Sequence, residues 1–267
     1  MTDTAHCALP PIYIINLARA SERRQRISAA LDALGLRHEI FDAVDGSRLD
    51  DQAIARAYDP AGARAGYRDM SRGEIACALS HQGVYRKMLD DGVPHALVME
   101  DDAQPGAALP GILATLAATI APEEPVAVLL THVDKYTAWG SRPLASPAPA
   151  RLVCRYQEWW LAHGYFLTRA AARNMLEKLH PVRSAADHWS RFDREGIVQL
   201  RAVVPYCIGL SELAAESSLE AHRADKDLAD KSHRSLRQLL YHYGYRRFIQ
   251  QIAVRPFLRV KRQRRSW

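Results

Sequence analysis

The chain has 267 residues, 48% of them hydrophobic and 25% charged, a composition typical of a folded globular protein. This length suits one large α/β domain or two small ones. Four scattered cysteines without a C-x-x-C pair argue against a disulfide framework and a zinc site, and indicate a reducing compartment. The N-terminus lacks signal-peptide features, and the longest apolar run (109–121) is too short to cross a membrane. We therefore expect a cytoplasmic protein.

Charge divides the chain into two unequal parts. The net charge is +6, but residues 234–267 contain nine arginines, one lysine and no acidic residue. This segment therefore carries +10, which leaves −4 on residues 1–233. We predict a mildly acidic folded domain over 1–233 and a basic, amphipathic, helical tail over 234–267. The acidic domain and the basic tail are expected to bind different partners.

The first elements predict a βαβ unit. "PIYIINL" (11–17) is a short β-rich run after a proline and indicates a buried strand. "ASERRQRISAALDALGL" (20–36) has apolar residues at helical spacing and a glycine near its end. "RHEIFDAV" (37–44) predicts a second strand. Strand, helix and strand within about thirty residues imply a parallel sheet with a right-handed crossover.

Later elements extend this pattern. Further strands are predicted at 95–99, 126–130, 160–168 and 198–204, with helical stretches between most of them. Residues 50–70 and 134–150 are rich in Ala, Gly, Pro and Ser, and are expected to be loops near an active-site edge. The whole pattern predicts an α/β, Rossmann-type fold with a mostly parallel sheet flanked by helices. Ligands of such sheets bind beyond the carboxyl ends of the strands.

An acidic triplet stands at one such strand end. "HALVMEDDA" (95–103) runs from a buried strand straight into Glu100, Asp101 and Asp102. Side chains alternate along an extended segment, so Glu100 and Asp102 share one side. Two carboxylates on one side suit Mg²⁺ or Mn²⁺ that also binds phosphate oxygens. The alternative is that Asp102 caps the helix near 106–118 while the others are solvated. Taken alone, the triplet also permits a metal-dependent hydrolase of nucleotide diphosphates.

Six stretches resemble glycosyltransferase family 25, which includes bacterial lipooligosaccharide galactosyltransferases and collagen galactosyltransferases. They follow the order of the family: "IYIINLARASERRQRI" (12–27), "FDAVDG" (41–46), "MSRGEIACALSHQGVYRKML" (70–89), "ALVMEDDA" (96–103), "HGYFLTRAAARNML" (163–176) and "AESSL" (215–219). "GEIACALSH" and "EDD" together are the specific blocks. The resemblance implies a GT-A-like fold and an inverting, metal-dependent transfer of a hexose, usually galactose, from a UDP-sugar. The implied acceptor is a saccharide, such as lipopolysaccharide or lipooligosaccharide core or another surface glycan.

The resemblance also implies where donor and metal bind. Glu100 and Asp102 would form the metal pair for Mn²⁺ or Mg²⁺. The nucleotide-sugar site would comprise Asn16, Leu17, Arg19, Arg23, Ala43, Asp45, Glu74, His81 and Asp101. Two of these residues have ordinary alternatives, since Arg23 suits a solvated helix arginine and Asp45 suits a β-turn in "VDGS".

Two polar residues on the helix that begins near Ser71 have competing interpretations. Ser71 and Glu74 have the spacing of a capping box, in which Glu74 bonds the Ser71 backbone amide. At about 100° per residue, Glu74 and His81 both fall within an apolar arc, about 10 Å apart along the axis. Polar groups buried there need partners. Glu74 is therefore either structural or part of the site, and His81 is either a core histidine or a site residue.

A catalytic base is expected among the remaining carboxylates, because an inverting transfer needs one to take the acceptor's hydroxyl proton. The family has a short Pro-hydrophobic-Asp pattern where this chain reads "HPVRSAADHW" (180–189). Asp187 is the nearest match, displaced by a few residues, and Asp134 is the reserve. His188 and Trp189 beside it are expected to help shape an acceptor pocket. Three tryptophans either stack on sugar faces or pack in the core: Trp159, Trp160 and Trp189.

The basic tail has three candidate uses. Apolar residues at helical spacing, among them Leu236 and Tyr243, lie beside arginine and glutamine. Such a segment binds anionic membrane surfaces, which would hold the protein at the inner face of a membrane beside a lipid-linked acceptor. Nucleic-acid binding is the rival use and is less favoured; it corresponds to a non-enzymatic nucleic-acid or surface-binding module. A solvated end is the third interpretation.

Overall fold

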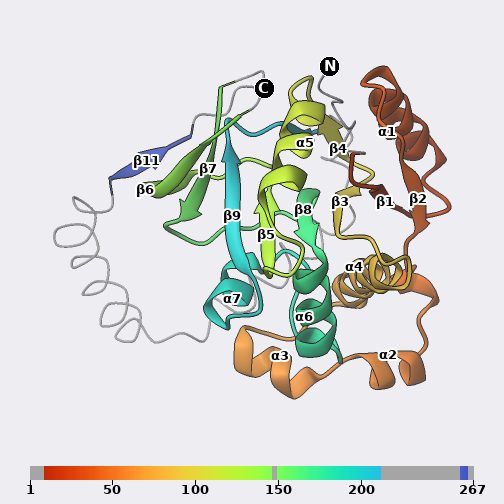
Figure 1. The fold of residues 1–267 in the computed structure, drawn as a ribbon. Coiled ribbons are helices and arrows are strands. Elements are labelled where there is room, and N and C mark those ends of the chain that lie inside the picture. The colour runs from red at the N-terminus through yellow and green to blue at the C-terminus, as the bar shows by residue number, and fades with distance from the viewer. Residues whose placement is uncertain (1–8, 146–148, 212–258, 264–267) are drawn as a thin grey trace.

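The computed structural model describes residues 9–145, 149–211 and 259–263 (Figure 1). A nine-stranded sheet has the order β11-β6-β7-β9-β5-β8-β3-β1-β2, and a two-stranded sheet pairs β10 with β4. The strands are β1 (Ile12–Asn16), β2 (Glu39–Asp42), β3 (His95–Glu100), β4 (Ala103–Pro105), β5 (Val126–Leu129), β6 (Lys135–Leu144), β7 (Ala150–Arg155), β8 (Gly164–Thr168), β9 (Gln199–Val204), β10 (Ile208–Leu210) and β11 (Val260–Arg262). The helices are α1 (Ser21–Ala33), η1 (Gly46–Arg48), α2 (Asp51–Ala57), α3 (Pro60–Gly66), α4 (Arg72–Asp90), α5 (Leu109–Thr119), α6 (Arg169–Leu179) and α7 (Trp189–Arg194).

The predicted βαβ unit is confirmed and brings three strand ends together. β1 pairs in parallel with β2 on one side and with β3 on the other. In this register Asn16 lies opposite Asp42, and Ile15 lies opposite Glu100. Carboxyl ends of parallel strands meet at one edge of a sheet. The ends of β1, β2 and β3 therefore form a common edge, and the acidic triplet begins there.

Antiparallel pairings predominate across the rest of the sheet. β8 lies antiparallel between β3 and β5, while β5 and β9 are parallel. The pairs β7–β9, β6–β7 and β11–β6 are antiparallel. The predicted α/β class, with a central sheet flanked by helices, is confirmed. The antiparallel strands are a feature that the sequence did not reveal.

Helices cover both faces of the sheet (Figure 1). One hydrophobic core includes Ile27 of α1 and Leu113 of α5, packed with side chains of the strands. The other core includes Met88 of α4, Met175 of α6 and Phe192 of α7. Burying both faces explains why the central strands are continuous apolar runs rather than alternating ones. This second core also supports the side chains described below.

Two regions expected to be loops are regular structure instead. Residues 50–70 contain α2 and α3, each begun by an aspartate: Asp50 accepts a hydrogen bond from the Ala53 amide, and Asp59 accepts one from Gly62. Pro60 follows as the first residue of α3, where a missing amide proton has no cost. Residues 134–150 contain the long strand β6 and the start of β7. In the first region the aspartate caps stabilise helices although the composition is typical of a loop. In the second region the pairing of β6 with β7 stabilises strands.

A short part of the tail, which was predicted to be helical, is instead a strand of the sheet. Val260–Arg262 pairs with β6 as its edge strand, and Arg262 Nε lies 3.2 Å from Asp134 Oδ1. Residues 234–258 and 264–267 and the "AESSL" block lie outside the described residues, so the division at 233/234 stays a prediction. In the part of the chain that the structure describes, no helix is both long and apolar enough to span a membrane.

Candidate active site

Helix α4 begins with the capping box that the sequence predicts. Ser71 Oγ accepts a hydrogen bond from the Glu74 amide at 3.2 Å, and Glu74 Oε2 accepts one from the Ser71 amide at 2.8 Å. Glu74 and His81 are 3% and 1% exposed, which confirms that both lie on the buried face of the helix. Burial alone would raise the pKa of Glu74, but hydrogen bonds from Arg68 and Ser71 lower it to about 2. Glu74 is thus a buried, fully ionised carboxylate.

His81 joins helix α4 to the acidic triplet. Its Nε2 lies 3.2 Å from Glu100 Oε1, and its Nδ1 lies 2.7 Å from the Tyr165 hydroxyl. It is therefore a core histidine with two partners and also a neighbour of the triplet. Cys77, one helical turn earlier, completes a group whose ligand atoms all lie within 4.8 Å of one another, together with His81 and Glu100. Sulfur and imidazole ligands suit a cation such as Zn²⁺. The sequence did not reveal this group, because Glu100 lies 19 residues after His81 along the chain.

The three carboxylates of the triplet have different surroundings. Asp101 accepts a hydrogen bond from Asn16 Nδ2 at 2.7 Å and lies 3.5 Å from Arg23 Nη1, so Arg23 is an ion-pair partner rather than a solvated arginine. Asp102 does not cap α5, because that helix starts at Leu109 and its N-cap residue is Ala108, with no side-chain cap hydrogen bond. Burial, followed by repulsion from Glu100 and Asp101, raises the pKa of Asp102 to about 7.

Oxygen donors at this edge fit a divalent cation. Asp102 Oδ1 and Asn16 Oδ1 are both buried without a hydrogen-bond partner. A buried acceptor without a partner is costly, and a hard cation such as Mg²⁺ or Mn²⁺ prefers carboxylate and amide oxygens. The chemistry of these donors therefore suits the metal pair expected at Glu100 and Asp102, with Asn16 as a further oxygen donor.

Several of the residues expected to bind the nucleotide lie at the same sheet edge, whereas Glu74 lines the cavity described below. The Ala43 amide donates to the Asn16 carbonyl at 2.9 Å, which ties the end of β2 to the end of β1. Asp45 accepts hydrogen bonds from the Ser47 amide and hydroxyl, as the turn interpretation predicts, and also forms an ion pair with Arg19. The fold thus places these segments side by side, next to the triplet.

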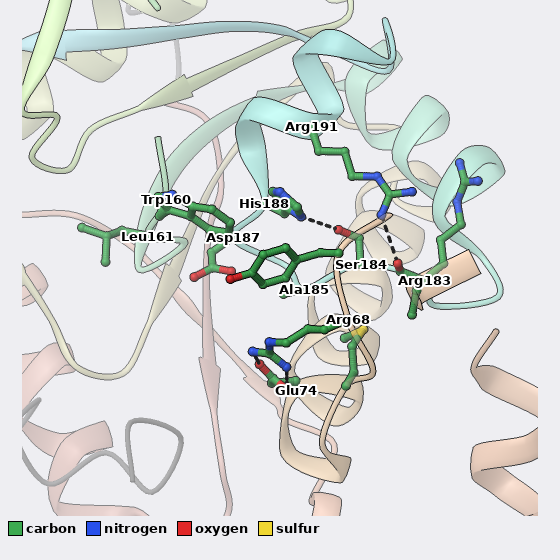
Figure 2. Close-up of a pocket in the computed structure, with 13 residues that line it drawn as sticks. Arg68, Glu74, Trp160, Leu161, Arg183, Ser184, Ala185, Asp187, His188 and Arg191 are labelled. Carbon is green, nitrogen blue, oxygen red and sulfur yellow. Dashed lines mark hydrogen bonds and ion pairs between the residues drawn. The ribbon is translucent and has the colours of Figure 1, made fainter. Parts of the chain in front are cut away.

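A cavity of about 250 Å³ lies beside Asp187 (Figure 2). Asp187 itself is only 9% exposed. The cavity is lined by Ala63, Tyr67, Arg68, Met70, Glu74, Trp160, Leu161, Arg183, Ser184, Ala185, Asp187, His188 and Arg191. These residues come from α3 and the segment after it, from α4, from the loop before β8 and from the segment around α7. A carboxylate at the wall of such a cavity can take a proton from a bound hydroxyl.

Two connections place this cavity near the triplet. The Glu100 amide donates to the His163 carbonyl at 3.2 Å, and Trp160 lies three residues earlier in the same loop. Glu74 lines the cavity and His81 contacts Glu100, and these two residues lie about 10 Å apart along α4 at 1.5 Å per residue. The cavity and the triplet therefore lie beside two levels of the same helix, about two turns apart.

The chain matches the family described as "Glycosyltransferase family 25 (LPS biosynthesis protein)" over residues 9–190. The chain belongs to glycosyltransferase family 25. It is 29% identical to the lacto-N-neotetraose biosynthesis glycosyltransferase LgtB of Neisseria meningitidis over 69% of this chain and 70% of LgtB. It is 25% identical to LgtE of the same bacterium, over 95% of this chain and 94% of LgtE.

Animal members of the family are longer. An "inactive glycosyltransferase 25 family member 3" from Homo sapiens is 29% identical over 62% of this chain. The chain spans 17% and 28% of the length of the first two animal relatives that it matches. The family match therefore establishes membership of glycosyltransferase family 25, while substrates and catalytic residues have to be argued from the site.

Trp189 does not line the pocket of this family 25 protein, contrary to expectation. It is fully buried and packs edge-on against Tyr165, with ring centroids 4.7 Å apart. Trp159 is 2% exposed and also belongs to the core. Both face the sheet because α7 and the loop before β8 pack against it. Of the three tryptophans considered for sugar stacking, only Trp160 lines the cavity.

Asp134, the reserve base, lies elsewhere. It precedes β6 and contacts Arg262 of the edge strand β11, and it is not among the residues that line the cavity. Its catalytic role stays a prediction. Tyr67 and Arg68 line the cavity although the sequence gave no reason to choose them. In the sequence these two residues are only a Tyr-Arg pair that follows α3. Such a pair is too common to predict a binding site.

Proposed function

We propose that this family 25 protein is an inverting, metal-dependent hexosyltransferase. It would move a hexose, galactose in the first instance, from a UDP-sugar to a saccharide acceptor. The observation that carries the metal-dependent donor site is Asp102, a buried carboxylate with an oxygen that lacks a partner and with two further carboxylates beside it. Such a concentration of negative charge favours a divalent cation that also holds a diphosphate.

On the donor side, the chain supplies ligands and positioning. Glu100 and Asp102 would hold Mn²⁺ or Mg²⁺, which supplies positive charge that stabilises the leaving diphosphate. His81 and Tyr165 would fix the Glu100 side chain through the contacts at 3.2 Å and 2.7 Å. Asn16 and Arg23 would orient Asp101, and Arg19 and Asp45 lie where the ribose and base would extend along the sheet edge.

On the acceptor side, Asp187 would act as the general base. The acceptor hydroxyl oxygen attacks the anomeric carbon while the bond from that carbon to the nucleoside diphosphate breaks. The hydroxyl proton passes to the Asp187 carboxylate, and the electron pair of the broken bond leaves with the diphosphate. Attack from the face opposite the leaving group inverts the anomeric carbon. The position of Asp187 at the cavity wall supports this role.

The acceptor class follows from the bacterial relatives. LgtB and LgtE carry names that refer to lacto-N-neotetraose biosynthesis, and the family description refers to lipopolysaccharide. We therefore assign to this chain a lipopolysaccharide or lipooligosaccharide core, or another surface glycan, as the acceptor.

A donor screen with and without metal tests the proposal. We expect transfer from one UDP-hexose, UDP-galactose first, in Mn²⁺, and no transfer in excess EDTA. Asp102→Asn should abolish Mn²⁺-dependent UDP binding by calorimetry, whereas Asp32→Asn on the exposed face of α1 should leave it unchanged. Full activity in EDTA would overturn the metal assignment. Rapid consumption of UDP-sugar without an acceptor, irrespective of the sugar, would favour a hydrolase instead.

The basic tail supports a separate proposal about location. Its charge of +10 against −4 on residues 1–233 favours attraction to anionic lipid, beside a lipid-linked acceptor. Flotation with liposomes should then require anionic lipid and weaken as salt is raised. Equal binding to neutral liposomes would contradict this. Glutamine substitutions of the arginines between 234 and 255, which leave β11 in place, should preserve turnover on a soluble acceptor, whereas a pure binding module would lose its function.

A further inference from the structure

Three aromatic rings gather at the Asp187 cavity. The rings of Trp160 and His188 are stacked, with centroids 4.6 Å apart and an interplanar angle of 19°. The Tyr67 ring meets His188 edge-on at 5.9 Å and lies 6.5 Å from Trp160. Trp160 and Tyr67 are 38% and 50% exposed, although large apolar rings are usually buried. Exposed rings grouped around a cavity mark a binding surface.

The charged groups around these rings are already engaged with one another. Arg68 makes two hydrogen bonds to Glu74, at 2.7 and 3.1 Å. Arg191 Nε lies 2.6 Å from Glu195, and Arg183 lies 3.4 Å from the same carboxylate. Burial, then the nearby Arg191, lowers the pKa of His188 to about 4, so its ring is neutral near pH 7. The cavity therefore presents ring surface and the Asp187 carboxylate rather than a surplus of positive charge.

We propose that Tyr67, Trp160 and His188 form a subsite for one uncharged pyranose ring of the acceptor. The apolar C–H face of the sugar would lie on the exposed aromatic surface, which turns a hydroxyl toward Asp187. The cavity of about 250 Å³ is smaller than most ligand pockets, which range over about 300–1,000 Å³. It therefore suits a single terminal sugar, with the rest of the glycan outside. This inference rests on the proposed transferase function, because it treats Asp187 as the group that meets the acceptor.

The nucleobase of the donor is the rival occupant, since a uracil ring also stacks on aromatic side chains. The residues that the sequence assigns to the nucleotide, such as Asn16 and Asp45, lie at the ends of β1 and β2. The three rings instead lie around Asp187, about two turns of α4 away from the contact between His81 and Glu100. This separation favours the acceptor sugar.

Binding measurements on the full chain test the subsite. The probes are uncharged methyl glycosides of galactose, glucose and N-acetylglucosamine, followed by saturation-transfer NMR, and UDP with Mn²⁺, followed by calorimetry. We expect Trp160→Ala to weaken glycoside binding and to raise the acceptor KM by about tenfold or more, with UDP affinity changed less than about twofold. Tyr67→Ala should act in the same direction. Trp160→Phe should restore most of the binding.

Trp139→Ala is the matched control. Trp139 is a tryptophan on β6, 70% exposed, that does not line the cavity. It should change neither binding constant. The proposal is overturned if no uncharged glycoside binds the wild type, if a sugar phosphate binds much better than its uncharged form, or if Trp160→Ala behaves like Trp139→Ala. It is also overturned if Trp160→Ala weakens UDP and spares the glycosides.

The outcomes separate this proposal from the proposed function. Transfer from a UDP-sugar that survives unchanged in Trp160→Ala would refute the subsite and leave the transferase assignment standing. Glycoside binding that depends on Trp160 in a protein that transfers from no nucleotide sugar would do the reverse.

Discussion

The acidic triplet and the Asp187 cavity lie beside different turns of helix α4, and their charges are arranged differently. At the triplet, three carboxylates follow one another in the chain, and Asp101 lies 3.5 Å from Arg23. The pKa of Asp102 there rises to about 7. At the cavity, Arg68 and Glu74 neutralise each other, and so do Arg191 and Glu195. One end therefore suits a cation and the diphosphate bound to it, whereas the other suits an uncharged sugar next to a single carboxylate.

The Asp187→Asn variant gives the largest expected effect. Loss of a general base lowers kcat by about 10²–10⁴-fold. Donor affinity should stay within about twofold, because the proposed donor site is at the triplet. Rapid-quench turnover and UDP calorimetry measure the two quantities separately. Weakened UDP binding would assign Asp187 to the donor site. Near-normal turnover would show that Asp187 is not the general base, and Asp134 would be the next candidate.

Breaking the Arg68–Glu74 pair tests how much the paired charges stabilise the cavity. In Arg68→Ala the Glu74 carboxylate, 3% exposed, stays buried without its partner. We expect the free energy of unfolding to fall by about 3 kcal/mol. The neighbouring ion pair between Arg64 and Asp69 has both side chains more than half exposed, so Arg64→Ala should cost less than about 1 kcal/mol. Equal losses in the two variants, measured by urea unfolding, would contradict the difference in burial.

Acid provides a further test of the same pair. Because the pKa of Glu74 is about 2 in the folded chain, below its ordinary value of 4.5, the unfolded chain binds the proton more readily. The pair therefore stabilises the fold fully above about pH 4.5, and this stabilisation disappears as pH falls toward 2. Arg68→Ala should show a shallower loss of stability over that range.

The neutral state of His188 gives the smallest expected effect. Its pKa of about 4 lies below the ordinary value of 6.5, so between these values the unfolded chain binds more protons. Stability should be complete above about pH 6.5 and lower by about 2 kcal/mol at about pH 5. His188→Gln should remove this part of the pH dependence, measured as unfolding temperature, and His38→Gln outside the cavity should not. An unchanged profile in His188→Gln would show that the ring is not held neutral.

Local sequence determined much of the donor side. The strand–helix–strand spacing predicted β1, α1 and β2, and the capping box and apolar arc predicted the start and buried face of α4. The acidic triplet at the end of a strand could be placed at the sheet edge because parallel strands end together. These features depend on residues close in sequence, where periodicity, capping and strand ends act directly.

The acceptor side was decided by the tertiary structure. Tyr67, Trp160 and His188 come from three distant segments, and only their packing makes a stacked group. Local pattern could not tell Trp160, which lines the cavity, from Trp159 and Trp189, which are buried against the sheet. The antiparallel insertion of β8 and the pairing of β11 with β6 depend on hydrogen bonds between remote strands. Side-chain contacts across such separations are set by how helices and strands pack, and a single sequence carries no periodic signal for them.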